Sequence, residues 1–211
     1  MHLLERIEEA ATTHHPHPLV PSSLTKEEKV TAIAHHFRQI MHILQLDLSE
    51  PSLNKTPERF AHMYVDELFW GLDTDAFPDV TYMDNDVMER AEGIVVIKDI
   101  PIKSMCEHHF VPIIGTAHVA YVPGEIILGL SKINRIVDYF CRRPQLQERL
   151  TTQIADALSI LLGINDIAVT IQAEHFCVTL RGIQHPTTRT QTIVSRGHFK
   201  DTPLFRDSNL N

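Results

Sequence analysis

Residues 93–122 read GIVVIKDIPIKSMCEHHFVPIIGTAHVAYV, and this stretch decides the fold of the chain. A β-branched run at Ile94 to Ile97 and an alternation of small, polar and apolar residues at Thr116 to Val122 both favour β-strands. The segment Ser104 to Phe110 lies between these runs and contains one cysteine and two histidines. We therefore expect two strands whose connection carries candidate metal ligands.

Two helices and two further strands are predicted after this stretch. The first helix opens near Ser131 and stops before the next proline, and the second carries an apolar stripe that runs to Leu161, with Gly163 as its terminator. Residues 167–178 and 190–194 have the composition of strands. The order strand-strand-helix-helix-strand-strand, without regular βαβ alternation, indicates an α+β domain with an antiparallel sheet.

A helical extension is predicted on the N-terminal side of this domain. Thr25 and Glu28 form a capping-box pattern ahead of an amphipathic stripe. A second helix is expected to begin with Thr56 as N-cap and Pro57 at its first helical position, and Gly71 can end it.

Three parts of the chain follow from these patterns. Residues 1–22 are expected to form a weakly ordered arm, because they lack sustained periodicity and end in a Pro-Ser-Ser run. Residues 23–92 form the helical region, which closes with an acidic, turn-rich linker from about Leu72. Residues 93–211 are expected to form the main domain, which contains the candidate metal ligands.

Composition narrows the classes of partner. Lysine and arginine total 19 against 27 aspartates and glutamates, a formal charge of -8 that would repel a polyanion, so we expect no nucleic-acid partner. Three cysteines, an odd number, argue against an extracellular disulfide framework. No secretory or membrane-spanning pattern is present in the sequence, so we expect a cytoplasmic protein without a membrane partner.

The sequence contains two candidate halves of a metal site. Cys106 is followed by His108 and His109, and a cysteine with a histidine close behind it can bind one zinc ion, although spacing alone does not choose between the two imidazoles. His175 and Cys177 lie near the end of a predicted strand, where alternation would place both on one face. The alternative is a buried apolar cysteine with ordinary surface histidines.

Cys141 competes as the third ligand, but it follows two aromatic residues at the end of a predicted helix, so we interpret it as a packing residue. Two thiolates and one imidazole leave the fourth tetrahedral position open, which is typical of catalytic zinc sites. A water bound there would have a lowered pKa. The two remaining histidines could then carry protons.

An anion site is a further candidate. Ser131, Lys132 and Arg135 open a helix, where unpaired backbone N–H groups, a hydroxyl and two cations could converge on a negative group. Arg181 could add another cation. The plainer interpretation is a capped helix with solvated charges.

Gln147 and Glu148 begin the next helix and could grip the edge of a purine, with the carboxylate accepting from N–H groups. An acidic residue in the first turn of a helix is also favourable through the helix dipole alone. The two residues themselves do not separate these alternatives.

Taken together, these motifs closely resemble those of the GTP cyclohydrolase I family, over nearly the whole chain after the N-terminal arm. The matching stretches are Thr56 to Arg59, Met63 to Glu67, Cys106 to Phe110, Gly129 to Arg135, Arg143 to Leu150, His175 to Val178, and Arg181 with Gly182.

The resemblance implies a role for each matching residue. One zinc ion per chain is bound by Cys106, His109 and Cys177. His108, His175 and Ser131 are catalytic. Substrate is bound by Gln147 and Glu148 at the guanine, and by Lys132, Arg135, Arg181 and, from a neighbouring subunit, Arg59 around the ribose and triphosphate.

The resemblance also implies a fold, an assembly and a reaction. The fold is the tunnelling fold, in which sheets of several subunits join into a barrel, and the assembly is a homodecamer of two pentamers with sites between subunits. Zinc-bound hydroxide attacks guanine C8 of GTP, His175 protonates N7 and His108 relays protons. Formate leaves, the ribose rearranges, and 7,8-dihydroneopterin 3'-triphosphate forms in the pathway to tetrahydrofolate and related pterins.

Two rival functions fit the sequence less well. A nitrile reductase of the same fold relies on a nucleophilic cysteine without a zinc triad, so the intact triad counts against it. A non-catalytic zinc-stabilised assembly protein would not need His108, His175 and Glu148. The sequence departs from the family pattern mainly at Gln184 to Arg196, which carries His185, Pro186 and Arg189, and in a short tail after His198.

Overall fold

The computed structural model describes residues 9–10, 20, 22–85 and 93–202. Most of the predicted arm at residues 1–22 and the end of the predicted linker, residues 86–92, lie outside the described residues. The division of the chain at residues 22 and 92 stays a prediction.

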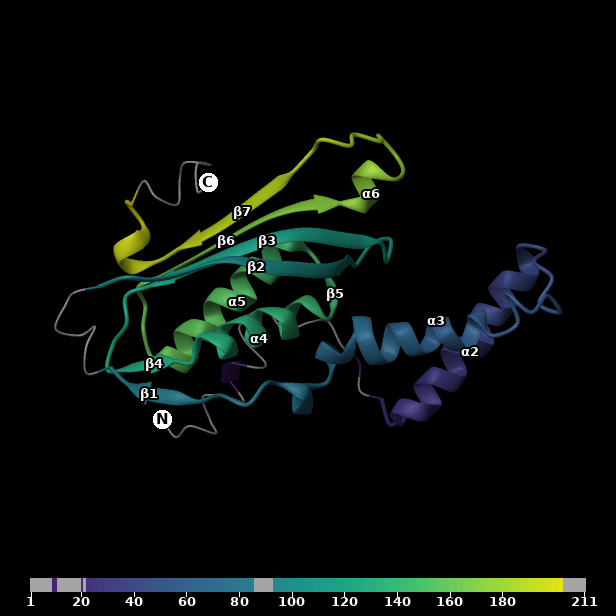
Figure 1. The fold of residues 1–211 in the computed structure, drawn as a ribbon, viewed down its shortest axis with the longest axis horizontal. Coiled ribbons are helices and arrows are strands. Elements are labelled where there is room, and N and C mark those ends of the chain that lie inside the picture. Colours follow the sequence, from purple (N-terminus) through teal and green to yellow (C-terminus); the bar gives the residue numbers. More distant parts are fainter. Residues whose placement is uncertain (1–8, 11–19, 21, 86–92, 203–211) are drawn as a thin grey trace.

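A helical pair extends away from the rest of the molecule (Figure 1). Helix α2 spans Lys26–Ile43 and begins with the predicted capping box, in which Thr25 Oγ1 accepts from the backbone N–H of Glu28 and the Glu28 carboxylate accepts from the N–H of Thr25. Helix α3 spans Thr56–His62 and packs along α2. The rings of Phe37 and Phe60 stack between them, with 3.6 Å between centroids.

The second helix differs from its prediction at both ends. Lys55, not Thr56, occupies the N-cap position, and Pro57 is the second helical residue, where its missing N–H still costs nothing. After His62 the helix continues as a π-helix, η1, over Met63–Leu68 and then ends. Gly71 therefore does not terminate it but lies in a separate turn, η2, at Trp70–Leu72.

Gly71 joins the helical pair to the main domain. Its N–H donates to the carbonyl oxygen of Arg142 at 3.0 Å, and its own carbonyl accepts from Nε of the buried Arg143 at 2.6 Å. A Cβ atom here would overlap the backbone oxygen of Tyr139.

We expect Gly71→Ala to destabilise the fold by about 1–3 kcal/mol, because rigid backbone must move to admit the methyl group. Thermal unfolding would measure this. Gly124→Ala is the matched control, since its Cβ would meet only Cγ2 of Ile164 at an ordinary 3.4 Å. Equal melting temperatures for the two variants would contradict the prediction.

The main domain is built on a five-stranded sheet with the order β5-β2-β3-β6-β7. Its strands are β2 at Val95–Cys106, β3 at Pro112–Tyr121, β5 at Pro144–Gln145, β6 at Ile167–His175 and β7 at Thr190–Ser195. The four long strands pair antiparallel, as predicted, and only the two-residue β5 pairs parallel, with the end of β2. Strand β2 is longer than its predicted core and ends on Cys106, so the connection to β3 is a tight turn.

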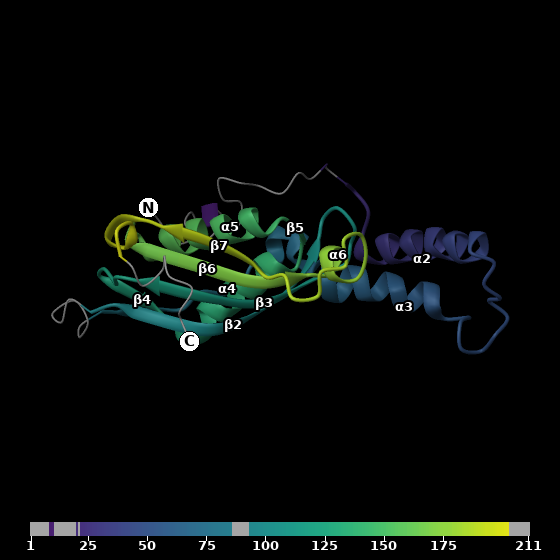
Figure 2. The ribbon, with the colours of Figure 1, turned by 90° about the horizontal axis from the view of Figure 1, so that it is seen from above.

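Helices α4 (Leu130–Cys141) and α5 (Gln147–Leu162) cover one face of the sheet (Figures 1 and 2). Both were predicted, and Gly163 ends α5 in the left-handed conformation at φ 68°. Their apolar sides and the facing side chains of β2, β3 and β6 form the core. Side chains at the start of β3 alternate in burial accordingly, since Ile113 is buried and Ile114 is 47% exposed.

A two-stranded sheet was not predicted. Strands β1 (Tyr82–Asp84) and β4 (Ile126–Leu128) pair antiparallel beneath the helices in Figure 1. β1 lies within the stretch interpreted as a linker.

The predicted strand over residues 167–178 is too long at its C-terminal end. β6 stops at His175, and Phe176–Thr179 forms one helical turn, α6. The alternation argument that placed His175 and Cys177 on one strand face is therefore wrong, although the two residues remain close. The architecture is the predicted α+β class, consistent with a tunnelling-type fold carrying a helical N-terminal region.

Candidate metal centre

Three side chains from separate elements meet at one end of the sheet. Cys106 is the last residue of β2 and is 4% exposed, His109 lies in the turn before β3, and Cys177 lies in α6. Because Ile113 of β3 pairs with His175 of β6, the turn and α6 leave the sheet at the same place. One ligand atom from each of the three residues lies within 4.8 Å of the other two.

This donor set fits a zinc ion. Ligand atoms around a tetrahedral zinc lie roughly 3.3–3.8 Å apart, so small side-chain movements would close the set. The guanidinium of Arg181 donates to Nε2 of His109 at 2.8 Å. Since a guanidinium can only donate, Nε2 of His109 accepts this hydrogen bond, and a metal ion bound through Nε2 would take the place of Arg181.

The thiols of Cys177 and Cys141 have contrasting surroundings. Burial, the neighbouring Cys106 thiol and its charge raise the pKa of Cys177, while Arg181 acts in the opposite direction. Cys141 is buried in the core, and burial raises its pKa to about 12. Cys141 is thus a packing residue, as predicted, and lies outside the group of three.

The two remaining histidines flank this centre. His108 is exposed, and its Nδ1 lies 3.9 Å from Sγ of Cys106. His175 is half-buried, and burial lowers its pKa while the charge of Glu148 works to raise it. Glu148 is exposed at the start of α5, so its carboxylate is available to a ligand near His175.

Gln147 has different surroundings from those expected of a group that grips substrate. Its side chain is 1% exposed, and its amide bonds to His175 and to strands β6 and β7.

An ion pair that no sequence motif predicts holds the metal-binding turn. Arg149 Nη1 lies 2.5 Å from Oε2 of Glu107, and both side chains are about one-fifth exposed. The backbone N–H of Glu107 also donates to the carbonyl of Gln145 at 3.1 Å. These contacts attach the turn to β5 and to the first turn of α5. The position of Glu107 among the candidate ligands was visible in the sequence, but nothing there pointed to Arg149.

The predicted anion residues do not all converge within one chain. Arg181 lies at the metal centre. Ser131, Lys132 and Arg135 lie in the first turns of α4, whereas the last residue of α4, Cys141, contacts β2 near the centre. Ten residues of helix separate Ser131 from that end, a distance of about 15 Å.

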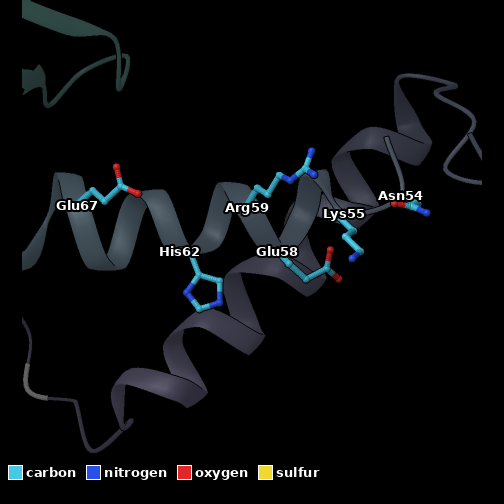
Figure 3. Close-up of a pocket in the computed structure, with 6 residues that line it drawn as sticks. All are labelled: Asn54, Lys55, Glu58, Arg59, His62 and Glu67. Carbon is cyan, nitrogen blue, oxygen red and sulfur yellow. The ribbon is translucent and has the colours of Figure 1, made fainter. Parts of the chain in front are cut away.

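Arg59 also lies apart from the centre. It projects from the side of α3 that faces away from α2, and Glu67 of the following η1 points the same way, while Glu58 and His62 point toward α2 (Figure 3). These residues line a shallow hollow together with Asn54 and Lys55. The hollow mixes both charge signs, and Glu58 is paired with Arg38 at 2.5 Å. We assign it no chemistry of its own.

None of the helices in the described ranges combines the length and the apolar character needed to cross a bilayer.

Comparisons with known proteins agree on one family. A model of the family described as GTP cyclohydrolase I matches residues 33–211. GTP cyclohydrolase 1 of Vibrio campbellii is 50% identical over 189 residues, which cover 90% of this chain and 86% of the relative. The protein of the same name from Aeromonas salmonicida is 50% identical over 186 residues, covering 88% and 84%. That from Yersinia enterocolitica is 50% identical over 193 residues, covering 92% and 87%.

Proposed function

The chain belongs to the GTP cyclohydrolase I family, and from this membership we propose that it converts GTP and water to 7,8-dihydroneopterin 3'-triphosphate and formate. The observation that carries the proposal is the group of Cys106, His109 and Cys177, with His175 and Glu148 beside it. A purely structural metal site would need neither of the last two residues. The reaction would be an early step toward tetrahydrofolate and related pterins, in the cytoplasm.

We assign one zinc ion per chain to the group of three. When bound, zinc would supply a water activated for attack on guanine C8. The buried Cys106 and half-buried Cys177 would hold it from the protein side, and the exposed His109 from the solvent side.

The surrounding residues would hold the base and move protons. The Glu148 carboxylate can accept hydrogen bonds from the N–H groups of guanine. His175 would deliver a proton to N7 as the bond to C8 breaks, and the exposed His108 would exchange protons with solvent. We assign Ser131 to the later rearrangement of the ribose.

A second copy of the chain would complete the site. Lys132 and Arg135 lie nine and six residues before the end of α4 that meets the metal centre, about 14 and about 9 Å of helix, so we propose that a triphosphate bound beside Arg181 takes such cations from a neighbour. Arg59 would likewise reach a neighbouring site. We propose a homodecamer of two pentamers, and the exposed apolar end of α2, with Ile43 78% and Leu44 65% exposed, supports contacts between copies.

Product analysis tests the function directly. Zinc-loaded protein incubated with GTP should release one formate for each GTP consumed, and oxidation of the other product should give a fluorescent pterin. GTP left intact by protein of full zinc content would rule out the catalytic proposal and favour a zinc-stabilised assembly protein.

Lys132→Ala should raise the KM for GTP by about tenfold with little change in kcat, because a charge that binds the triphosphate equally in the ground and transition states contributes only to binding. Lys29→Ala, which removes an exposed lysine of α2, is the control and should leave KM unchanged. An unchanged KM in Lys132→Ala would show that Lys132 does not bind the triphosphate and is a solvent-exposed charge.

A further inference from the structure

The side chain of Gln147 connects the metal centre to the edge strand β7. Its amide nitrogen donates to the carbonyl oxygens of Ile171 and Thr190, each at 3.0 Å, and lies 3.1 Å from Oγ1 of Thr192. Its amide oxygen lies 2.7 Å from Nε2 of His175. At 1% exposure, this side chain has its polar groups turned to protein partners on both sides.

The partners fix which atom is the donor at each contact. Backbone carbonyl oxygens only accept, so the NH₂ end of the Gln147 amide must face Ile171 and Thr190. The oxygen end then faces His175, and because this oxygen also only accepts, Nε2 of His175 must carry a hydrogen. A neutral imidazole has one N–H, so its Nδ1 is left with the lone pair.

We infer that Gln147 is a positioning residue that fixes the ring orientation and tautomer of His175, so that Nδ1 is the nitrogen that exchanges a proton with the substrate. The inference rests on the proposed function, in which Nδ1 of His175 first takes up a proton from solvent and then gives it to guanine. Both N–H groups of Gln147 are already engaged, so recognition of the base passes to its exposed neighbour Glu148.

Strand β7 takes part in this arrangement. Oγ1 of Thr192 lies 2.6 Å from Oγ1 of Thr151, which in turn lies 2.7 Å from the carbonyl oxygen of Gln147. The stretch Gln184 to Arg196, where the sequence departs from the family pattern, thus supplies two of the groups that hold Gln147. Changes in β7 would reach the reaction through His175 without any contact with substrate.

Gln147→Met tests the inference by keeping the length of the side chain while removing its hydrogen bonds. We expect kcat to fall about 10–100-fold, the range for residues that orient a reacting group. KM should change by less than about threefold, because no contact with guanine is lost. Gln153→Met is the matched control: Gln153 is a fully buried amide on the same helix, bonded to Gln145, and its loss should lower stability but spare kcat.

A second measurement reads the tautomer itself. Zinc-loaded protein with ¹⁵N-labelled histidine, without substrate, should show the Nε2–H form of neutral His175, with its signals identified by their absence in His175→Ala. Gln147→Met should show both tautomers. Thr192→Val, which alters only the edge strand, should shift the ratio of the two tautomers in the same direction. This variant provides the test if Gln147→Met folds poorly.

The outcomes separate this inference from the proposed function. A raised KM with unchanged kcat in Gln147→Met would make Gln147 a guanine-binding group and overturn the inference. An Nδ1–H form in the unmodified protein would overturn it as well. If the unmodified protein released no formate from GTP, the proposed function would fail, and the tautomer measurement would still decide whether Gln147 fixes His175.

Discussion

Cys177→Ala is expected to lose zinc and turnover together, with kcat lower by at least about 10³-fold. Cys177 comes from α6, whereas Cys106 and His109 come from the turn that ends β2. Its removal leaves two ligands from one short segment, too few for a tetrahedral catalytic site. Metal content after dialysis, measured by atomic emission, and formate release from GTP would be followed on the same samples.

Cys141→Ala is the matched control for this loss. Cys141 is also an unpaired cysteine, but it is buried in the core away from the group of three. Its replacement should lower stability by about 1 kcal/mol through a small cavity while zinc content and kcat stay unchanged. Zinc retained by Cys177→Ala, or lost by Cys141→Ala, would show that the ligand set is wrongly assigned.

Local signals in the sequence predicted most of the elements. The capping box at Thr25 and the left-handed Gly163 act within one helical turn, and the structure places both as predicted. The order of strands and helices in the main domain also follows from patterns a few residues long.

The errors lie where distant contacts decide the local structure. Strand β1 exists only because it pairs with β4 more than forty residues later, and neither segment is long enough to show alternation. The run after His175 has β-branched residues and reads as strand, yet α6 forms there, beside the metal-binding turn. A glycine after an apolar stripe predicts a helix terminator at Gly71. Its packing against Tyr139 and Arg142 is not predicted, because these residues lie far away in the sequence.

The candidate site divides in the same way. The ligand types and their proximity to His175 could be predicted, because two short motifs contain them all. The ion pair of Glu107 with Arg149 and the support of Gln147 by Thr192 could not, since each joins segments about forty residues apart with no sequence signal linking them. The separation of Lys132 from the metal centre could not be predicted either, because it depends on the direction in which α4 runs.

His175→Ala is expected to keep its zinc and lose turnover, with kcat lower by about 10²–10⁴-fold, the usual contribution of a general acid or base. His175 stands beside the three ligand residues without belonging to the group within mutual reach. The zinc content should therefore stay at one ion per chain. Turnover should recover in part when free imidazole is added, because the small base can enter the space vacated by the side chain.

His118→Ala provides the comparison for this loss. His118 is a half-buried histidine on the neighbouring strand β3, where its ring accepts from the N–H of Asp99, far along the sheet from the turn that carries Cys106. Its loss should leave zinc content and kcat intact and imidazole without effect. Because both variants delete a half-buried ring from the same sheet, a drop in kcat confined to His175→Ala would reflect chemistry and not packing. Full activity in His175→Ala would remove His175, and with it the positioning role of Gln147, from the reaction.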